Sequence, residues 1–283
     1  MPDAADPDDD ARNGAVPGST RRGVLRRRGA RTQALDDAIA EEVPVAFVFN
    51  DAPFAVMMAT PGDFEDFARG FSLSEGIVAS PADVAVEAVN ALVEGWEVRV
   101  RIPGARAEAL QRRRRSLSGR SGCGICGSEL LEAAMRWPEP VGAGVAITDT
   151  VLQSALRGLK AGQRLAGATG ATHAAGWADA DGAIVLVRED VGRHNALDKL
   201  IGAMASAGID PQSGFAVATS RASYEMAMKA ASAGIALLAA VSAPTALAIS
   251  LAERANLTLV GFAREDGYAV YSHPWRLREA GTP

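Results

Sequence analysis

The chain has 283 residues, of which 48% are hydrophobic, and a formal net charge of −5. Its length suffices for one large domain or two smaller ones, and its negative charge argues against general nucleic-acid binding, so local arginines would have to meet any anionic ligand. No run of eighteen apolar residues occurs, so we expect no transmembrane helix and no membrane association. Only two cysteines are present, which favours a reducing compartment such as the cytoplasm.

The N-terminal stretch changes from acidic to basic along its length. Residues 1–33 begin with DAADPDDD after Met-Pro and continue with RRGVLRRRGAR. The pair Arg21-Arg22 resembles the start of a twin-arginine export signal, but no apolar segment follows it, so we expect a cytoplasmic protein. Because this stretch carries little apolar surface, we predict a disordered leader over residues 1–33.

Residues 34–140 are predicted to form a smaller N-terminal α+β domain that ends in a cysteine-containing loop. The apolar runs at 43–50 and 54–60 predict a β-hairpin, and a further strand is expected at 97–103. Thr60 followed by proline predicts the N-cap of a helix. At helical spacing this helix carries three aromatic residues that we assign to the core: Phe64, Phe67 and Phe71.

Residues 141–276 alternate apolar strands with helices and are predicted to form the second domain. Four strands are expected, at 183–189, 215–220, 235–241 and 257–263. Continuous apolar strands separated by helices indicate a mostly parallel or mixed sheet in an α/β layer fold. In such folds ligands bind beyond the carboxyl ends of the strands.

Polar residues follow these strands at the positions where a ligand is expected. Arginines and hydroxyls at helix starts favour anion binding, although each one alone is also typical of a helix cap with a solvated arginine. We expect Arg193, Arg221 and Arg264 to converge on one anion. The candidate ligand-binding residues also include His194, Asn195, Ser220 and His173, the last of which lies among small residues.

Both cysteines lie in one CxxC motif flanked by glycines, Ser121-Gly122-Cys123-Gly124-Ile125-Cys126-Gly127. A short helix is predicted over 128–137, which favours thiolates at its start and therefore reactive sulfur chemistry. Half of a zinc site and a structural or inert pair are the alternatives; zinc needs about four ligands, and only three histidines are present. The arginine-rich run at 112–120 is predicted to be flexible.

Several long blocks together resemble the formate dehydrogenase accessory sulfurtransferase family (FdhD). They include VPVAFVFN, MMATPGDFEDFARGFSLSEGIV, SGCGICG, EDVGRHNALDKLIGA, SRASYEMAMKAASAGI, VSAPTALAI and LTLVGFAR, and they span about Val43 to Tyr271. The resemblance implies that residues 141–276 form a cytidine-deaminase-like three-layer α/β cofactor-binding domain.

The resemblance also implies a function and a site. Members of the family are understood to take persulfide sulfur from a cysteine desulfurase and to pass it to the molybdenum cofactor, Mo-bis(molybdopterin guanine dinucleotide), before the cofactor enters a formate dehydrogenase catalytic subunit. Cys123 is then the persulfide carrier and Cys126 its companion, and a homodimer is suggested. The cofactor-contacting stretch maps to Phe262, Ala263, Arg264, Glu265, Asp266 and Gly267. The family often has a small or basic run where this chain has Glu265-Asp266-Gly267.

Two functional hypotheses remain open on the sequence. The first is a sulfurtransferase that carries sulfur on a CxxC cysteine, and the second is a cofactor-binding chaperone whose CxxC motif is structural or redox-responsive. A thioredoxin-like reductase is a weaker third. A zinc deaminase requires HxE and PCxxC motifs, whereas Ala-Ala follows His173 and Asn-Ala follows His194, so we expect no zinc and no other metal site.

Overall fold

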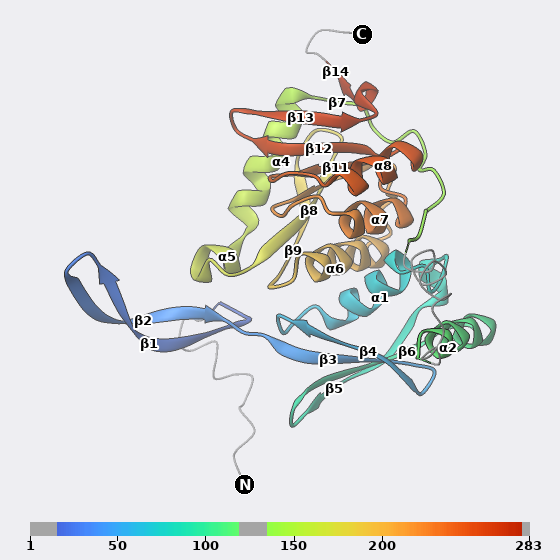
Figure 1. Cartoon of the computed structure of the whole chain (residues 1–283), viewed down its shortest axis with the longest axis horizontal. Helices are drawn as coiled ribbons and strands as arrows, with labels where there is room; N and C mark the ends of the chain where they lie inside the picture. The colour runs from blue at the N-terminus through green and yellow to red at the C-terminus, as the bar shows by residue number, and fades with distance from the viewer. Residues whose placement is uncertain (1–15, 119–134, 279–283) are drawn as a thin grey trace, which may run out of the picture.

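The computed structural model describes residues 16–118 and 135–278, with the backbone alone for 113–118. Its main element is a mixed six-stranded sheet of strand order β13-β12-β11-β10-β8-β9 (Figure 1). Strands β10, β11 and β12 are parallel, and the remaining pairings are antiparallel. The strands are β8 (His173–Asp179), β9 (Ile184–Asp190), β10 (Gly214–Ala218), β11 (Leu237–Ala240), β12 (Thr258–Arg264) and β13 (Gly267–Ser272).

Helices cover both faces of this sheet, which makes three layers. One face packs against α4 (Asp149–Gly162), which is followed by the short α5 (Arg164–Thr169). The other face packs against α6 (Arg193–Ser206), α7 (Tyr224–Ser232) and α8 (Ala246–Arg254). The predicted α/β layer fold with its strand–helix alternation is therefore confirmed.

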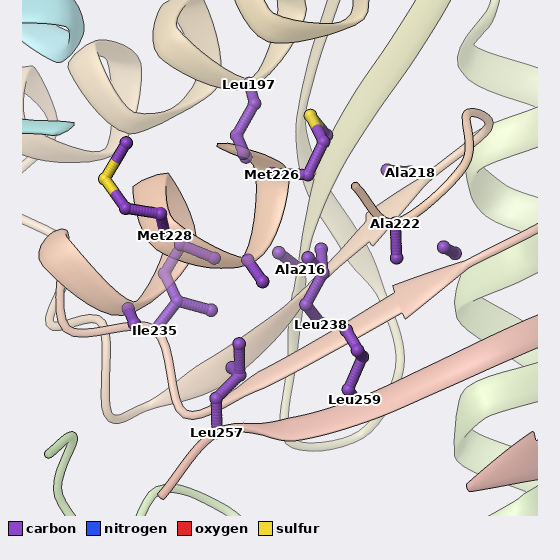
Figure 2. Close-up of a cluster of buried hydrophobic side chains, with 14 of the residues drawn as sticks. Leu197, Ala216, Ala218, Ala222, Met226, Met228, Ile235, Leu238, Leu257 and Leu259 are labelled. Atoms are coloured by element: carbon purple, nitrogen blue, oxygen red, sulfur yellow. The ribbon is translucent and has the colours of Figure 1, made fainter. Parts of the chain in front are cut away.

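Successive residues of a strand point to opposite faces of the sheet, and helices cover both of these faces. In β11, Leu237 contributes to the cluster beneath α4, whereas its neighbour Leu238 belongs to the cluster on the opposite face. Figure 2 shows Leu238 in that second cluster together with Leu197 of α6 and Met226 of α7. A strand that is buried on both sides has to be apolar at every position.

A second, four-stranded sheet lies on the N-terminal side of the molecule, in the order β4-β3-β6-β5. The predicted hairpin is confirmed, and its turn residues Asn50 and Asp51 have φ angles of 46° and 65°. The helix α1 (Phe64–Ser74) packs Phe64, Phe67 and Phe71 against this sheet, as predicted. The strands are β3 (Val43–Phe49), β4 (Ala52–Ala59), β5 (Ala85–Leu92) and β6 (Gly95–Arg101), with the 3-10 turn η2 (Pro81–Asp83) before β5.

Thr60 does not cap α1, contrary to the prediction. The helix begins three residues later, and its N-cap position is Asp63, which has a left-handed backbone conformation. Thr60 instead contacts the end of β9: its backbone nitrogen donates to Asp190 at 3.0 Å, and its hydroxyl accepts the amide hydrogen of Val191 at 3.1 Å. A contact with a distant part of the chain has therefore displaced the local capping pattern.

The prediction of a disordered leader is wrong for residues 19–33. These residues belong to a hairpin of β1 (Ser19–Arg28) and β2 (Arg31–Ala40), which extends away from the rest of the molecule in Figure 1. Arg22 lies opposite Asp37 in the register, and Arg26 forms an ion pair of 2.9 Å with Asp37. The backbone pairing of the two strands over residues 19–40 is what orders this part of the chain.

The arginine-rich run is also more ordered than expected, because α2 (Gly104–Ser118) includes residues 112–118. Ala107 and Leu110 of α2 are buried against the four-stranded sheet and anchor the helix. The remaining short elements are β7 (Ile147–Thr148), η3 (Pro274–Arg276) and β14 (Leu277–Arg278). Within residues 16–118 and 135–278, no helix has the length and apolarity needed to cross a membrane. The division into domains at residues 34–140 and 141–276 stays a prediction.

Candidate functional site

A cavity of about 660 Å³ opens at the edge of the six-stranded sheet where β10, β11 and β12 end. Apolar side chains form one part of its wall: Leu156 and Leu159 from α4, and Val241 and Ala263 from the strand ends. Polar side chains form the remainder: Lys160, Gln163, Thr172, His173, Thr219, Arg264, Glu265 and Asp266. In this class of fold ligands bind beyond the carboxyl ends of the strands, which is where this cavity lies.

The cavity brings together five of the residues that the sequence singled out: His173, Ala263, Arg264, Glu265 and Asp266. His173 begins β8, which runs opposite to β10, so its start lies at the same edge as the end of β12. Phe262 and Gly267 belong to the same stretch but do not line the cavity. Phe262 is 45% exposed and has a φ angle of 51°, which is unusual for a bulky residue.

The helix α4 holds the β12–β13 turn through polar contacts along its length. The side chain of Gln153 donates to the carbonyl oxygen of Arg264 at 2.8 Å, and Lys160 pairs with Glu265 at 3.5 Å. The hydroxyl of Tyr268 donates to Asp149, and burial together with this hydrogen bond raises the pKa of Tyr268 to about 12. These contacts position the turn that carries Glu265 and Asp266 beside the cavity.

Sequence reasoning missed the contribution of α4 to the site. The helix was not among the predicted elements, although Leu152, Leu156 and Leu159 recur at helical spacing and are buried. That spacing was available as a signal for a helix. It contains no information on which sheet edge the helix borders.

The surroundings of the two histidines at this edge lower their pKa values. Burial lowers the pKa of His173, and the positive charge of Arg193 lowers it further. The pKa of His194 is also lowered, first by burial, even though the Glu225 carboxylate 2.8 Å from Nε2 acts in the opposite direction. The positive charge of Arg193 lowers the pKa of both rings, and its Nε atom is buried without a hydrogen-bond partner among the described residues.

The other predicted ligand residues do not line the cavity. His194 lies at the start of α6, where its Nε2 is also 3.5 Å from the hydroxyl of Ser223. Asn195 is buried and donates to the carbonyl oxygen of Met58 and to Asp190, which is a structural role. Ser220 is buried and donates to the carbonyl oxygen of Arg221, whose side chain is exposed. Of the three arginines expected to converge, only Arg264 lines the cavity, so the predicted convergence is not seen.

The two cysteines, Cys123 and Cys126, and the helix predicted at 128–137 as far as residue 134 lie outside the described residues. The chain resumes at the N-terminal end of α7. The hydroxyl of Tyr224 accepts the backbone N–H of Arg136 at 2.5 Å and donates to its carbonyl oxygen at 2.8 Å. The guanidinium of Arg136 forms an ion pair with Glu75 after α1, so residue 136 is fixed between α1 and α7.

Comparisons with known proteins agree on one family. The family model described as FdhD/NarQ family matches residues 40–278. The sulfur carrier protein FdhD of Xanthomonas campestris pv. campestris (strain 8004) is 61% identical over 261 residues, which cover 92% of this chain and 93% of the relative. The sulfur carrier protein FdhD of Cupriavidus necator is 53% identical over 255 residues, covering 90% of this chain and 88% of the relative.

A solved structure shows the same fold. It is described as a formate dehydrogenase accessory protein from Desulfotalea psychrophila and is similar with a TM-score of 0.72 at 22% sequence identity, covering 93% of this chain and 100% of that chain. At this identity the likeness supports the fold alone. The family model and the close relatives cover most of the chain, and the chain therefore belongs to the FdhD/NarQ family.

Proposed function

We propose that this protein is a sulfur carrier that serves formate dehydrogenase. In this function Cys123 accepts persulfide sulfur from a cysteine desulfurase, and the sulfur passes to Mo-bis(molybdopterin guanine dinucleotide), which is bound as a substrate. The observation that carries the proposal is the cavity at the sheet edge, because its wall includes Ala263, Arg264, Glu265 and Asp266 from the stretch that the family resemblance assigns to the cofactor. Close relatives named sulfur carrier protein FdhD support the same conclusion.

The cavity has a size and a chemistry that suit a nucleotide. Its volume of about 660 Å³ is in the range of small-molecule sites. Lys160, Gln163 and Arg264 supply hydrogen-bond donors for phosphate oxygens, and Glu265 and Asp266 supply acceptors for the donor edge of a guanine base. We therefore propose that the cavity binds one guanine dinucleotide arm of the cofactor.

Sulfur loading is a thiol exchange between two proteins. The thiolate of Cys123 attacks the terminal sulfur of the desulfurase persulfide, the sulfur–sulfur bond of that persulfide breaks, and the desulfurase cysteine leaves as a thiolate. The products are a persulfide on Cys123 and a desulfurase thiolate, so no external oxidant or reductant is needed. A cytoplasmic location would keep both thiols reduced. The formate dehydrogenase catalytic subunit is the recipient of the sulfurated cofactor, and a second copy of this chain is the expected assembly partner.

Intact-mass measurement after incubation with a cysteine desulfurase and cysteine tests the carrier function. We expect the mass of one added sulfur atom on the wild-type chain and on Cys126→Ala, and no added mass on Cys123→Ala. Loss of loading in Cys126→Ala alone would reverse the roles of the two cysteines. A wild-type chain that binds a guanine nucleotide but gains no sulfur would instead identify a cofactor-binding chaperone.

A further inference from the structure

Glu189 of β9 binds the first turn of α5, which follows the cavity-lining residue Gln163. Its Oε2 atom accepts the backbone N–H of Leu165 at 2.8 Å, and its Oε1 atom accepts the backbone N–H of Ala166 at 2.7 Å. These two amides belong to the first turn of α5, where no backbone carbonyl is available to them. The side chain of Glu189 thus replaces a helix cap that the local sequence of α5 does not provide.

The same carboxylate fixes the hydroxyl of Thr172, which lines the cavity next to His173. The Thr172 Oγ1 atom lies 3.2 Å from Oε1 of Glu189. Both oxygens of Glu189 already accept backbone N–H groups, so the hydroxyl is the donor in this bond. Having given its single hydrogen to Glu189, the hydroxyl retains only lone pairs. Among the described residues, no other hydrogen bond involves the Thr172 side chain.

We propose that Thr172 is a specificity-determining residue of the cavity and that it accepts a hydrogen bond from a donor group of the bound guanine nucleotide. The donor is either the 2′-hydroxyl of the ribose or the amino group of the base. This inference rests on the proposed function, because it concerns the same cavity. Glu189 is the positioning residue that gives Thr172 its acceptor character.

The fixed hydroxyl excludes the phosphates from this part of the wall. Phosphate oxygens are acceptors, and a hydroxyl whose hydrogen is already used cannot donate to them. Lys160 and Arg264 are the phosphate-binding candidates, since both carry donors only. Thr172 therefore helps to set the direction in which the nucleotide lies in the cavity.

Calorimetric titration of the full chain with three nucleotides tests the proposal. The probes are GDP, 2′-deoxy-GDP, which lacks one ribose hydroxyl, and inosine diphosphate, which lacks the amino group of the base. For the wild-type chain we expect one of the two analogues to bind about tenfold more weakly than GDP, because one hydrogen bond is lost. The analogue that loses affinity identifies the donor group.

The variants separate recognition from a structural effect. In Thr172→Val the wild-type discrimination should disappear, with GDP falling to the affinity of the weaker analogue. Thr172→Ser should restore it, and Glu189→Gln should reduce it, because a glutamine cannot accept all three hydrogen bonds through both of its terminal atoms. The matched control is Thr169→Val, which removes a hydroxyl bonded at 2.8 Å to the carbonyl oxygen of Leu165 in α5 and does not line the cavity.

The outcomes also separate this inference from the proposed function. A wild-type chain that binds GDP but does not distinguish the analogues overturns the role of Thr172 and leaves the nucleotide site intact. Equal weakening of all three nucleotides in Thr172→Val has the same meaning, because it indicates a structural effect. A wild-type chain that binds none of the three nucleotides refutes the proposed cofactor site and the inference together.

Discussion

Lys199 of α6 and Asp190 at the end of β9 form a salt bridge of 2.8 Å whose side chains are 1% and 0% exposed. Asp190 also accepts the backbone N–H of Gly192 at 2.8 Å, and Lys199 donates to the carbonyl oxygen of Thr60 at 2.8 Å. Because Thr60 follows β4, this buried pair joins the four-stranded sheet to the edge of the six-stranded sheet.

We expect Lys199→Met to lower the free energy of unfolding by about 3–5 kcal/mol, because it leaves the carboxylate of Asp190 buried without its cation. Urea denaturation followed by circular dichroism measures the change. Lys160→Met is the control, since its side chain is 78% exposed and its pairing with Glu265 contributes at most about 1 kcal/mol. Equal free energies of unfolding for the two variants would show that the buried pair contributes no more to stability than the exposed one.

Two glycines allow α1 and α6 to pack in close contact. A methyl group at Gly70 would lie 1.7 Å from the carbonyl oxygen of Asp198, and one at Gly202 would lie 1.8 Å from the carbonyl oxygen of Asp66. Because backbone atoms cannot move aside independently, we expect Gly70→Ala to lower the free energy of unfolding by about 3 kcal/mol or more. Gly104→Ala, where no atom lies within 4 Å, should leave it unchanged or raise it by up to about 1 kcal/mol. Thermal unfolding of both variants measures the difference, and a Gly70→Ala protein with the wild-type midpoint would contradict it.

Arg264 should contribute more to nucleotide binding than Arg221, because only Arg264 lines the cavity. We expect Arg264→Ala to weaken GDP binding by about 1.5–3 kcal/mol, which is the range of a hydrogen bond to a charged group. Arg221→Ala should bind GDP as the wild-type chain does. Titration calorimetry of both variants measures the two affinities. A larger loss of GDP affinity in Arg221→Ala would indicate that the phosphates bind at the end of β10 instead.

GDP binding should strengthen as the pH falls toward the lowered pKa of His173. Burial and the charge of Arg193 hold the pKa of His173 below its ordinary value of about 6.5, so the free imidazole is neutral at pH 7. The phosphates are expected at Lys160 and Arg264, but the negative charge of bound GDP in the same cavity still favours the charged imidazole and raises this pKa, so binding takes up a proton. Calorimetry in buffers of different ionisation enthalpy measures the uptake. His173→Gln should remove the pH dependence, and its persistence in that variant would assign it to another group.

The depressed pKa of His173 has a separate consequence for the folded state without ligand. An unfolded histidine protonates near its ordinary pKa of about 6.5, before the buried ring does. The contribution to stability is therefore intact above that pH and is lost as the pH falls through it toward the lower folded pKa. The pH dependence of the unfolding midpoint in the wild-type chain and in His173→Gln measures this contribution.

The sequence alone determined the regular part of the fold. β10 and β11 are buried and apolar at every position, so they stood out from the helices between them, and apolar runs also marked the strands that become β9 and β12. The phenylalanines of α1 stood out through their helical spacing. The motif blocks likewise indicated the family, and the stretch from Ala263 to Asp266 lies at the cavity that the strand ends form.

Only the tertiary structure decided which of the polar residues meet. His194 and Ser220 follow strands just as Arg264 does, yet they do not line the cavity, while Lys160 and Thr172 come from segments without a motif. Thr60 was predicted to cap α1, but it instead contacts Asp190, which lies 130 residues away in the chain. Periodic burial and turn preferences depend on residues that are close together in the chain, so they can be predicted from the sequence. The walls of a cavity depend on how elements far apart in the chain pack together, and their positions are therefore set by the folded structure as a whole.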